Sequence, residues 1–475
     1  MMKIQCSDFI RDKIEEMQEF IDRLSGKFER VSILGTDVSG LTFRVSRTGT
    51  QLSDYGFKER GFVVRVLKNG HYFEYSFNEW DEIDHLVETF MDAFRANNDL
   101  VKEAELNYFD ELGGDDQMEY ESMETEVKTT LDDLSSAEIM ERLTHLRDCV
   151  LAIDERILDV VFVINNVHTS KAYTSSLKAL SQSYMLTDAM VQVTVKEGNQ
   201  VQAEMQATSG MKGMEVIDEL EKLAQKALNG ALELLGAKRM KPGVYDVITA
   251  PEVSGLIAHE AFGHGVEMDM FVKNRAKAKD YMGKRVASDL VTMIDGANGV
   301  EQVASYLFDD EGTLGHQTVL IKNGILQNGI SDRASAYRLG KEPTGNGRRE
   351  SYERKAYARM TNTYFEKGTS KLDEMIASIQ YGFLLEGMFS GMEDPKHWGI
   401  QCIIAKAREI VDGKLTGEIY SPVILTGYVP TLLQSISMVS DEIQLSGTGY
   451  CGKGHKEWVR VSDGGPYLKA KARLG

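Results

Sequence analysis

Closely spaced turn signals are the feature that most restricts how the second half of this sequence can fold. They recur as residue pairs that favour tight turns: Asp295-Gly296, Asn323-Gly324, Asn328-Gly329, Asp412-Gly413 and Gly464-Gly465. Turns this frequent leave room for short strands and few long helices. The Asn-Gly pair at 323–324, flanked by apolar residues, predicts a hairpin with a type I′ turn. Residues 238–475 are therefore predicted to form a β-rich domain with a few helices.

Residues 1–237 carry a different pattern, in which helical and strand periods alternate. Apolar spacing predicts helices over residues 7–25, 79–96, 135–157 and 215–235. Strands are predicted over residues 41–47, 61–67, 72–77, 160–165, 185–196 and 200–208. Ser135 or Ser136 is suited to cap the third helix. The predicted fold class is α+β, with an N-terminal domain of mixed helix and strand over residues 1–237.

Acidic residues dominate the charge balance. The chain of 475 residues has 54 Lys and Arg against 73 Asp and Glu, which gives a net charge of −19. A protein that neutralises nucleic-acid phosphates needs the opposite balance, so direct nucleic-acid binding is not expected. Ten of the carboxylates fall in residues 103–126, which contain no Lys or Arg. That run predicts a solvated acidic linker.

Targeting and membrane signals are not expected in this chain. Its start alternates charged and apolar residues, unlike a signal peptide, and its longest apolar runs are far shorter than the ~20 residues of a spanning helix. The four cysteines lack the paired spacing of a disulfide framework. We therefore expect a cytoplasmic protein with reduced thiols and no membrane contact.

The strongest chemical signal is His259-Glu260-Ala261-Phe262-Gly263-His264, an H-E-x-x-x-H. Pro251 in a first turn, and a capping box from Thr249 to Glu252, predict a helix that starts near Ala250. In a regular helix, a five-residue step rotates by about 140°, too far for two imidazoles to share one ion. A π-type bulge would bring them together. The alternative is a pair of core histidines that flank a buried, salt-bridged Glu260.

A catalytic zinc site needs a third protein ligand. The sequence leaves several candidates open: Glu267, Asp269, His316, His397, Cys402, Cys451 and His455. Cys451 lies in a Gly-rich segment, residues 447–455, where Lys453 could lower the thiol pKa. Cys402 lies in an apolar run and is predicted to be an inert core residue. The match of residues 447–452 to G-x-G-x-x-G is accidental, because too little chain follows for a dinucleotide fold.

Several blocks of the second half, taken together, resemble the TldD/TldE family, also called PmbA or "modulator of DNA gyrase" proteins. The blocks are HEAFGH at 259–264, DDEGTLG at 309–315, TVLIKNG at 318–324, DRASA at 332–336, TGNGRRES at 344–351, RMTNTYFEKG at 359–368 and SGTGYCGKG at 446–454. They occur in the family's order and span most of residues 238–475. The chain differs from the family after Gly454 and between Glu386 and Trp398.

The resemblance implies a zinc metallopeptidase that cleaves unfolded peptides or small proteins. By this resemblance the zinc ligands fall on His259, His264 and Cys451, on a metal-binding helix and in a C-terminal segment, and Glu260 is the catalytic base that activates the zinc-bound water. The family usually works as a TldD–TldE heterodimer, so we expect a homodimer or a heterodimer with a TldE-like paralogue, with this chain as the TldD-like catalytic type.

The oxyanion or substrate contacts that such a peptidase needs have three candidates in this sequence, namely Arg348, Arg349 and Tyr450.

Two other functions remain open at this point. In a thiol hydrolase, Cys451 would be the nucleophile and His455, or a histidine that is close in space, its base. That reading predicts activity that chelators do not affect. A non-catalytic subunit that binds and modulates another protein is the second alternative, and it predicts no cleavage even when zinc is fully bound.

Overall fold

The computed structural model describes residues 1–101, 118–455 and 457–475. Its first half runs β1 (Met2–Lys3), α1 (Asp8–Arg11), α2 (Ile14–Leu24), β2 (Arg30–Ser46), β3 (Gly49–Asp54), β4 (Glu59–Lys68), β5 (His71–Phe77), α3 (Ile83–Val101), β6 (Glu119–Glu124), β7 (Glu126–Val127), α4 (Ser136–Leu151), β8 (Ile157–Ser175), β9 (Lys178–Glu197), β10 (Gln200–Gly210), a 3₁₀ turn (Met214–Glu219) and α5 (Leu220–Leu234). No helix in these ranges or in the rest of the described chain is long and apolar enough to cross a membrane.

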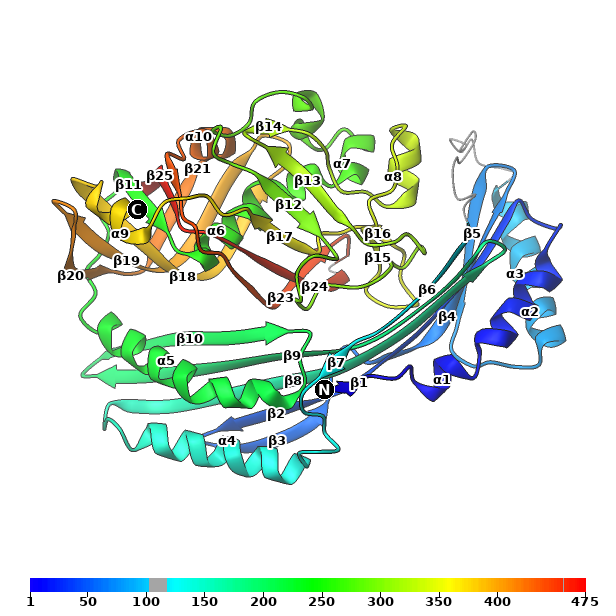
Figure 1. Cartoon of the computed structure of the whole chain (residues 1–475), viewed down its shortest axis with the longest axis horizontal. Coiled ribbons are helices and arrows are strands. Elements are labelled where there is room, and N and C mark those ends of the chain that lie inside the picture. The colour runs from blue at the N-terminus through cyan, green and yellow to red at the C-terminus, as the bar shows by residue number, and fades with distance from the viewer. Residues whose placement is uncertain (102–117, 456) are drawn as a thin grey trace.

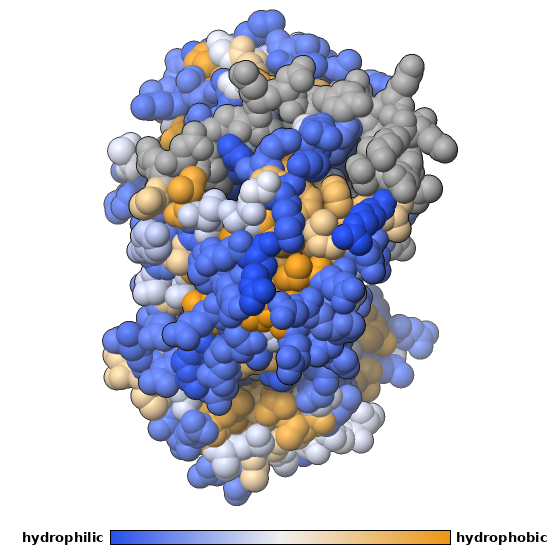
Figure 2. Space-filling model, turned by 90° about the vertical axis from the view of Figure 1, so that its right-hand side faces the viewer, coloured by the Kyte–Doolittle hydropathy of each residue, from blue (hydrophilic) through white to orange (hydrophobic). Residues whose placement is uncertain are grey.

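One long, curved sheet organises this half (Figure 1). Its strand order is β10-β9-β8-β2-β4-β5, with β3 added beside β2 and β6 beside β9. Helices α4 and α5 pack under one end of the sheet, where Phe162 and Val191 belong to their shared core. Helices α2 and α3 pack against the other end around Phe20, Phe62 and Phe90. The face on that side is largely hydrophilic with small apolar patches, because these helices turn their apolar stripes toward the sheet (Figure 2).

The strands are longer than the sequence predicts, and three of the four predicted helices are shorter or divided. Strands β8 and β9 extend far beyond the predicted ranges 160–165 and 185–196 and pair along nearly their whole length. The helix predicted over residues 7–25 is two helices, α1 and α2. The capping prediction is confirmed at Ser135, whose hydroxyl accepts from Glu138 N while Glu138 bonds back. Most of the predicted acidic linker lies outside the described residues.

The end of that acidic segment is a strand, so the linker prediction is wrong there. Strand β6 pairs in parallel with β9 along residues 119–124. Two lysines balance its charge: Lys178 lies 2.8 Å from a Glu119 oxygen, and Lys3 lies 2.9 Å from a Glu124 oxygen. Composition predicted solvation because it cannot show which cations the fold brings alongside.

The second half continues with β11 (Gly243–Thr249), α6 (Pro251–Leu256), a π-helical segment (Ile257–Gly263), a 3₁₀ turn (His264–Val266), α7 (Met268–Val272), a further 3₁₀ turn (Lys277–Tyr281), β12 (Met293–Gly296), β13 (Gln317–Lys322), β14 (Ile325–Leu326), α8 (Arg333–Arg338), β15 (Gly347–Arg348), β16 (Tyr357–Ala358), β17 (Asn362–Phe365), α9 (Leu372–Ala377), β18 (Tyr381–Asp394), β19 (Gly399–Val411), β20 (Lys414–Tyr420), β21 (Val423–Tyr428), α10 (Val429–Gln434), β22 (Met438–Val439), β23 (Gln444–Lys453), β24 (Glu457–Gly465) and β25 (Leu468–Leu474). The predicted α+β class and the β-rich second half are confirmed.

Two mixed sheets form this half. One has the order β11-β18-β19-β21-β25-β22, with β20 beside β19 and a further pairing of β11 with β25, and the other has the order β14-β13-β12-β17-β24-β23. The predicted hairpin joins β13 and β14, and Asn323 and Gly324 have φ of 47° and 79°, as a type I′ turn requires. The predicted domain boundary at 237/238 falls between α5 and β11, and the division into two domains stays a prediction.

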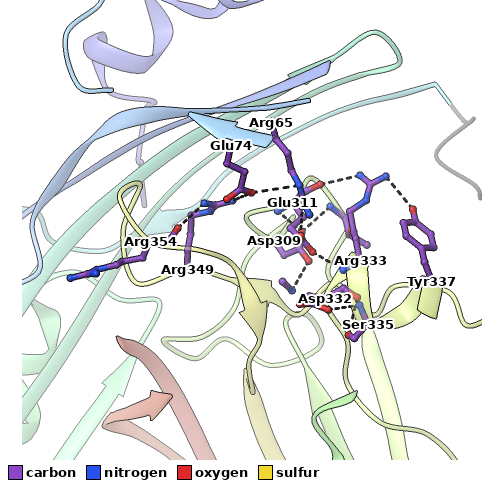
Figure 3. A network of polar contacts seen from close by, with 12 residues as sticks. Arg65, Glu74, Asp309, Glu311, Asp332, Arg333, Ser335, Tyr337, Arg349 and Arg354 are labelled. Atoms are coloured by element: carbon purple, nitrogen blue, oxygen red, sulfur yellow. Dashed lines mark hydrogen bonds and ion pairs between the residues drawn. The ribbon is translucent and has the colours of Figure 1, made fainter. Parts of the chain in front are cut away.

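Buried ion pairs join the two halves (Figure 3). Glu311, on a loop of the second half, pairs with Arg65 of β4 and accepts from Arg333 N at 2.6 Å. Arg349 donates to Glu74 of β5 at 3.0 Å. Because these groups lie out of water, each charge depends on its partner, and the network fixes how the first sheet sits on the second half.

Glu311→Gln should lower the free energy of unfolding by about 3 kcal/mol, because it removes the nearer of the two carboxylates that face the buried Arg65 guanidinium and leaves only Glu74, at 3.5 Å. Asp84→Asn is the control, since Asp84 pairs with Arg23 in a solvent-exposed bridge that contributes about 1 kcal/mol or less. Chemical unfolding of both variants at equal metal content measures the difference. Equal transition midpoints would contradict a structural role for the network.

Candidate metal centre

The H-E-x-x-x-H segment leaves the α-helix at the motif itself. Helix α6 covers Pro251–Leu256, a π-helical segment covers Ile257–Gly263, and a 3₁₀ turn begins at His264. The predicted π-type bulge is therefore confirmed. The wider turn brings the rings of His259 and His264 to a centroid distance of 5.1 Å, perpendicular to each other.

One local expectation about this helix needs correction. The N-cap residue is Ala250, and no side-chain capping bond forms. Thr249 Oγ1 instead bonds Ser254 Oγ at 2.7 Å, and Glu252 accepts from Gly387 N of β18 at 2.8 Å, so the capping box is wrong. Gly263 has ordinary helical angles, and its value is steric: a Cβ there would lie 2.2 Å from Met360 Sδ.

Cys451 reaches the two histidines from strand β23. Its Sγ lies 3.5 Å from His264 Nε2, and one donor atom from each of His259, His264 and Cys451 lies within 4.8 Å of the others. Donors of a tetrahedral zinc ion stand about 3.4–3.6 Å apart, so this trio is close to that spacing. His259 is buried and its Nδ1 has no hydrogen-bond partner among the described residues. Two imidazoles and a thiol are a donor set that suits zinc, and the residues therefore fit the ion.

The electrostatics of the trio favour a thiolate. Burial raises the pKa of the Cys451 thiol, but hydrogen bonds and charge from His259 and His264 outweigh it and hold the pKa well below its usual range. Burial lowers the pKa of His264, but Glu267 and Cys451 raise it by more than burial lowers it. The pKa of His264 therefore lies well above its usual value. The site thus stabilises a thiolate next to positively charged imidazoles. A metal cation can take over the role of that positive charge.

A second group of residues positions the trio. Glu267 Oε2 lies 3.3 Å from His264 Nδ1 and accepts from Lys453 Nζ at 3.0 Å. Lys453 also donates to Asp269 at 2.7 Å. Because Lys453 follows Cys451 on β23, these contacts tie the thiol-bearing strand to the turn that carries His264. Buried Arg359 adds a contact to the Cys451 carbonyl.

Two further carboxylates near the trio gave no sequence signal. Burial raises the pKa of Asp463 to about 6, although the nearby His259 lowers it. Burial also raises the pKa of Glu393 well above its usual range, and His264 only partly offsets the added effect of Glu260 and Glu267. Neither residue belongs to a recognisable motif, because the topology alone brings β18 and β24 against the π-helical segment.

The remaining predicted residues lie in different places. Arg348 donates to the Met360 carbonyl at 2.6 Å, Arg349 is engaged with Glu74, and the Tyr450 hydroxyl bonds that of Tyr55. Their roles as oxyanion or substrate contacts stay predictions. Cys402 is buried in β19, and burial raises its pKa to about 12, consistent with an inert thiol. The candidate histidines outside the trio are exposed at His316, His397 and His455.

A cleft of about 530 Å³ opens between the two halves, and its lining reaches the surroundings of this centre through Asp463, a neighbour of His259. One wall is β10 and α5, and the other includes Met388 of β18, Ser446 and Thr448 of β23, and Asp463. Within the described residues β23 pairs only with β24 and so ends its sheet. The strand that carries Cys451 therefore presents an edge to the cleft.

Glu267→Gln should weaken zinc binding by about 10–100-fold, because it removes the carboxylate that orients His264 and balances Lys453. Asp280→Asn, at an exposed carboxylate, is the control and should bind zinc as the parent does. Competition with a chromophoric chelator measures both affinities. An unchanged affinity in Glu267→Gln would show that His264 needs no support from this residue.

Comparison with known proteins finds relatives that are named metalloproteases. A family model described as the PmbA/TldA metallopeptidase C-terminal domain matches residues 242–472. A metalloprotease of Methanothermobacter thermautotrophicus is 27% identical over 460 residues, 96% of this chain and 95% of that relative. A metalloprotease of Methanocaldococcus jannaschii is 36% identical over 279 residues, 59% of this chain and 61% of that relative. A zinc metalloprotease TldD homolog of Saccharolobus solfataricus is 32% identical over 232 residues, 49% of this chain and 51% of that relative.

Solved structures share the fold. TldE from Thermococcus kodakarensis has a TM-score of 0.73 at 18% identity, over 97% of this chain and 99% of that one. A candidate modulator of a DNA gyrase from Thermotoga maritima has a TM-score of 0.77 at 17% identity, over 98% of this chain and all of that one. The matching family model and the relatives relate this chain to the metallopeptidases. Over residues 242–472 the chain matches the TldD/PmbA family, and over nearly its whole length it is similar to a metalloprotease.

Proposed function

We propose that this chain is a TldD-like zinc peptidase, with His259, His264 and Cys451 as zinc ligands and Glu260 as general base. The observation that carries the proposal is the mutual approach of three donor atoms, within 4.8 Å, from positions 259, 264 and 451. When bound, zinc supplies a Lewis acid that polarises a peptide carbonyl and lowers the pKa of a water molecule. The name of the Saccharolobus relative supports zinc as the metal.

Glu260 is suited to move a proton. It follows a ligand directly on the π-helical segment, and its charge is felt by buried Asp463 and Cys402. A carboxylate in that place takes a proton from water and returns it to the leaving amine. Lys453 and Glu267 hold the ligands meanwhile, so the geometry is kept by side chains that do not react.

Unfolded peptides or small proteins are the substrates that the cleft suits best. An extended peptide can pair with the edge of β23 through backbone hydrogen bonds, which do not depend on side-chain identity. The likeness to TldE is consistent with a TldD/TldE partnership, so we propose a TldE-like paralogue, or a second copy of this chain, as the partner.

Metal content together with peptide cleavage tests the function. Mass spectrometry of the purified chain should give one zinc per chain, and unfolded peptides should be cleaved, with activity lost on chelation and regained with zinc. The assay is run with and without a TldE-like partner. Full zinc occupancy without cleavage in either case would favour a non-catalytic binding subunit instead.

A thiol hydrolase remains the second candidate, because the contact between Cys451 Sγ and His264 Nε2 at 3.5 Å also suits a nucleophile and its base. This is the second form of the sequence-based alternative, a histidine close in space, since His455 is exposed in the turn after β23. Activity that survives chelation would favour it. Inhibition by alkylation does not discriminate, because alkylation also removes a zinc ligand.

A further inference from the structure

Glu393 is a buried carboxylate that the described chain balances only in part, because His264 and the backbone N–H of Gly265 favour its charged form while burial, Glu260 and Glu267 oppose it. Both of its carboxylate oxygens are out of contact with water, and among the described residues neither accepts a hydrogen bond of normal geometry. The charged neighbours that act on it include two more carboxylates, Glu260 and Glu267, besides His264. Burying such a group costs free energy unless a cation or donors compensate it. A chain that keeps this carboxylate beside its candidate metal centre is arranged for a positive group that comes from outside.

The backbone of β18 aims Glu393 at the centre. Alternate residues of a strand share a face, so Gly391 and Glu393 both face the motif segment. A Cβ on Gly391 would lie 2.4 Å from Glu260 Cγ, and a Cβ on Gly265 would lie 2.8 Å from Glu393 Oε1. Glu260 thus passes over Gly391, while Glu393 fits against Gly265, the residue after His264.

An irregularity in the sheet sets this orientation. The register of β18 against β19 shifts between Met388 and Ser390, so Phe389 is the extra residue. One extra residue exchanges the two faces of everything that follows it. Without the shift, Gly391 and Glu393 would face away from the motif segment. Bulges that re-aim a side chain are common beside active sites.

We propose that Glu393 recognises a primary ammonium group of the substrate, either the N-terminus of a peptide or a lysine side chain. This inference rests on the proposed peptidase function and names the chemistry of its substrate. Glu393 lies two residues after Gly391, the residue of β18 that faces Glu260. An ammonium paired with Glu393 is therefore roughly 7 Å along the strand from the position of Glu260. That separation matches an ammonium close to the cleaved bond. A site that otherwise tolerates any sequence would then prefer peptides with a free N-terminus, or a lysine, near that bond.

Matched peptides test the proposal in the zinc-loaded chain with its partner. One pair has the same sequence with a free or an acetylated N-terminus, and a second, N-acetylated pair carries lysine or acetyl-lysine. We expect kcat/KM to be at least about tenfold higher for the peptide with the ammonium in one of the pairs. The pair that responds identifies the source. Equal values in both pairs would overturn the proposal.

Variants tie the preference to this residue. Glu393→Gln should bring the ratio within about twofold of unity, Glu393→Asp should retain part of it, and Asp373→Asn, at an exposed carboxylate on α9, should keep it in full. A zinc content that falls in Glu393→Gln while the ratio persists would assign the residue to the metal and overturn the proposal. If Glu393→Gln does not fold, the wild-type comparison still decides.

A binding measurement separates this inference from the proposed function. Fluorescence anisotropy of labelled free and acetylated peptides, and of the lysine pair, on the zinc-loaded Glu260→Gln chain needs no turnover. Preferential binding of the ammonium form without any hydrolysis by the parent chain would uphold the recognition site and remove the peptidase. Hydrolysis by the parent chain, together with equal binding of the ammonium and acetylated forms, would uphold the peptidase and remove the recognition site.

Discussion

Glu260→Gln is expected to abolish peptide cleavage while leaving the zinc content at that of the parent chain. The substitution keeps the size of the side chain and removes only its capacity to accept and release a proton. General acid–base catalysis contributes about 10²–10⁴-fold, so kcat should fall by that factor. The ligands themselves are untouched, because Glu260 is not one of the three side chains whose donor atoms converge.

Steady-state cleavage of an unfolded peptide and metal analysis of the same sample measure the two effects together. Glu366→Gln, an exposed carboxylate just after β17, is the matched control and should retain both activity and zinc. Turnover in Glu260→Gln at a rate close to that of the parent would refute the assignment of the base. A loss of zinc would mean that this carboxylate supports the metal, and the kinetic loss would then say nothing about proton transfer.

Local sequence signals predicted those features that depend on neighbouring residues. The turn at Asn323 and Gly324 follows from backbone angles that few residue types adopt. The π-helical segment follows from the five-residue spacing of His259 and His264, because a regular helix would separate the two rings. In both cases the physical cause lies within about one helical turn of the residues concerned, so one sequence is enough to infer it.

Features that depend on distant partners were missed or shortened. Strands β8 and β9 continue well past their apolar cores, because pairing with each other and with β2 satisfies a backbone whose side chains alternate less clearly. Thr249 and Glu252 match a capping box, yet they bond Ser254 and Gly387 instead, since β18 lies against the start of the helix. Tertiary contacts here override a local preference that is worth about 1 kcal/mol.

Within the candidate site the same division holds. The H-E-x-x-x-H motif itself contains His259, Glu260 and His264. Cys451 was one of several candidates for the third ligand until the family resemblance selected it. Glu393 had no signal at all, because its position depends on one extra residue in β18 and on the absence of a side chain at Gly265. A buried carboxylate that lies beside two others is visible only once the packing around it is known.

Cys451→Ser is expected to lose zinc together with activity. The variant exchanges a soft thiolate for a hydroxyl, and zinc affinity should fall by more than about 100-fold, beyond what the loss of a supporting residue costs. Metal analysis after dialysis against a weak chelator measures this. Cys402→Ser is the control, because that cysteine is buried in β19 and is not one of the three side chains whose donor atoms converge, so the zinc content should stay unchanged.

This variant also separates the two chemical readings of the site, because both predict a loss of activity and only one predicts a loss of metal. If Cys451 is a nucleophile, as its contact with His264 Nε2 at 3.5 Å permits, the variant keeps its zinc and loses only turnover. Cobalt substitution gives an independent view, since a thiolate ligand produces a sulfur-to-metal charge-transfer band that Cys451→Ser should remove. Full zinc occupancy and an unchanged cobalt spectrum in the variant would move the third ligand elsewhere, and Glu267, the carboxylate next to His264, would then be the first residue to test.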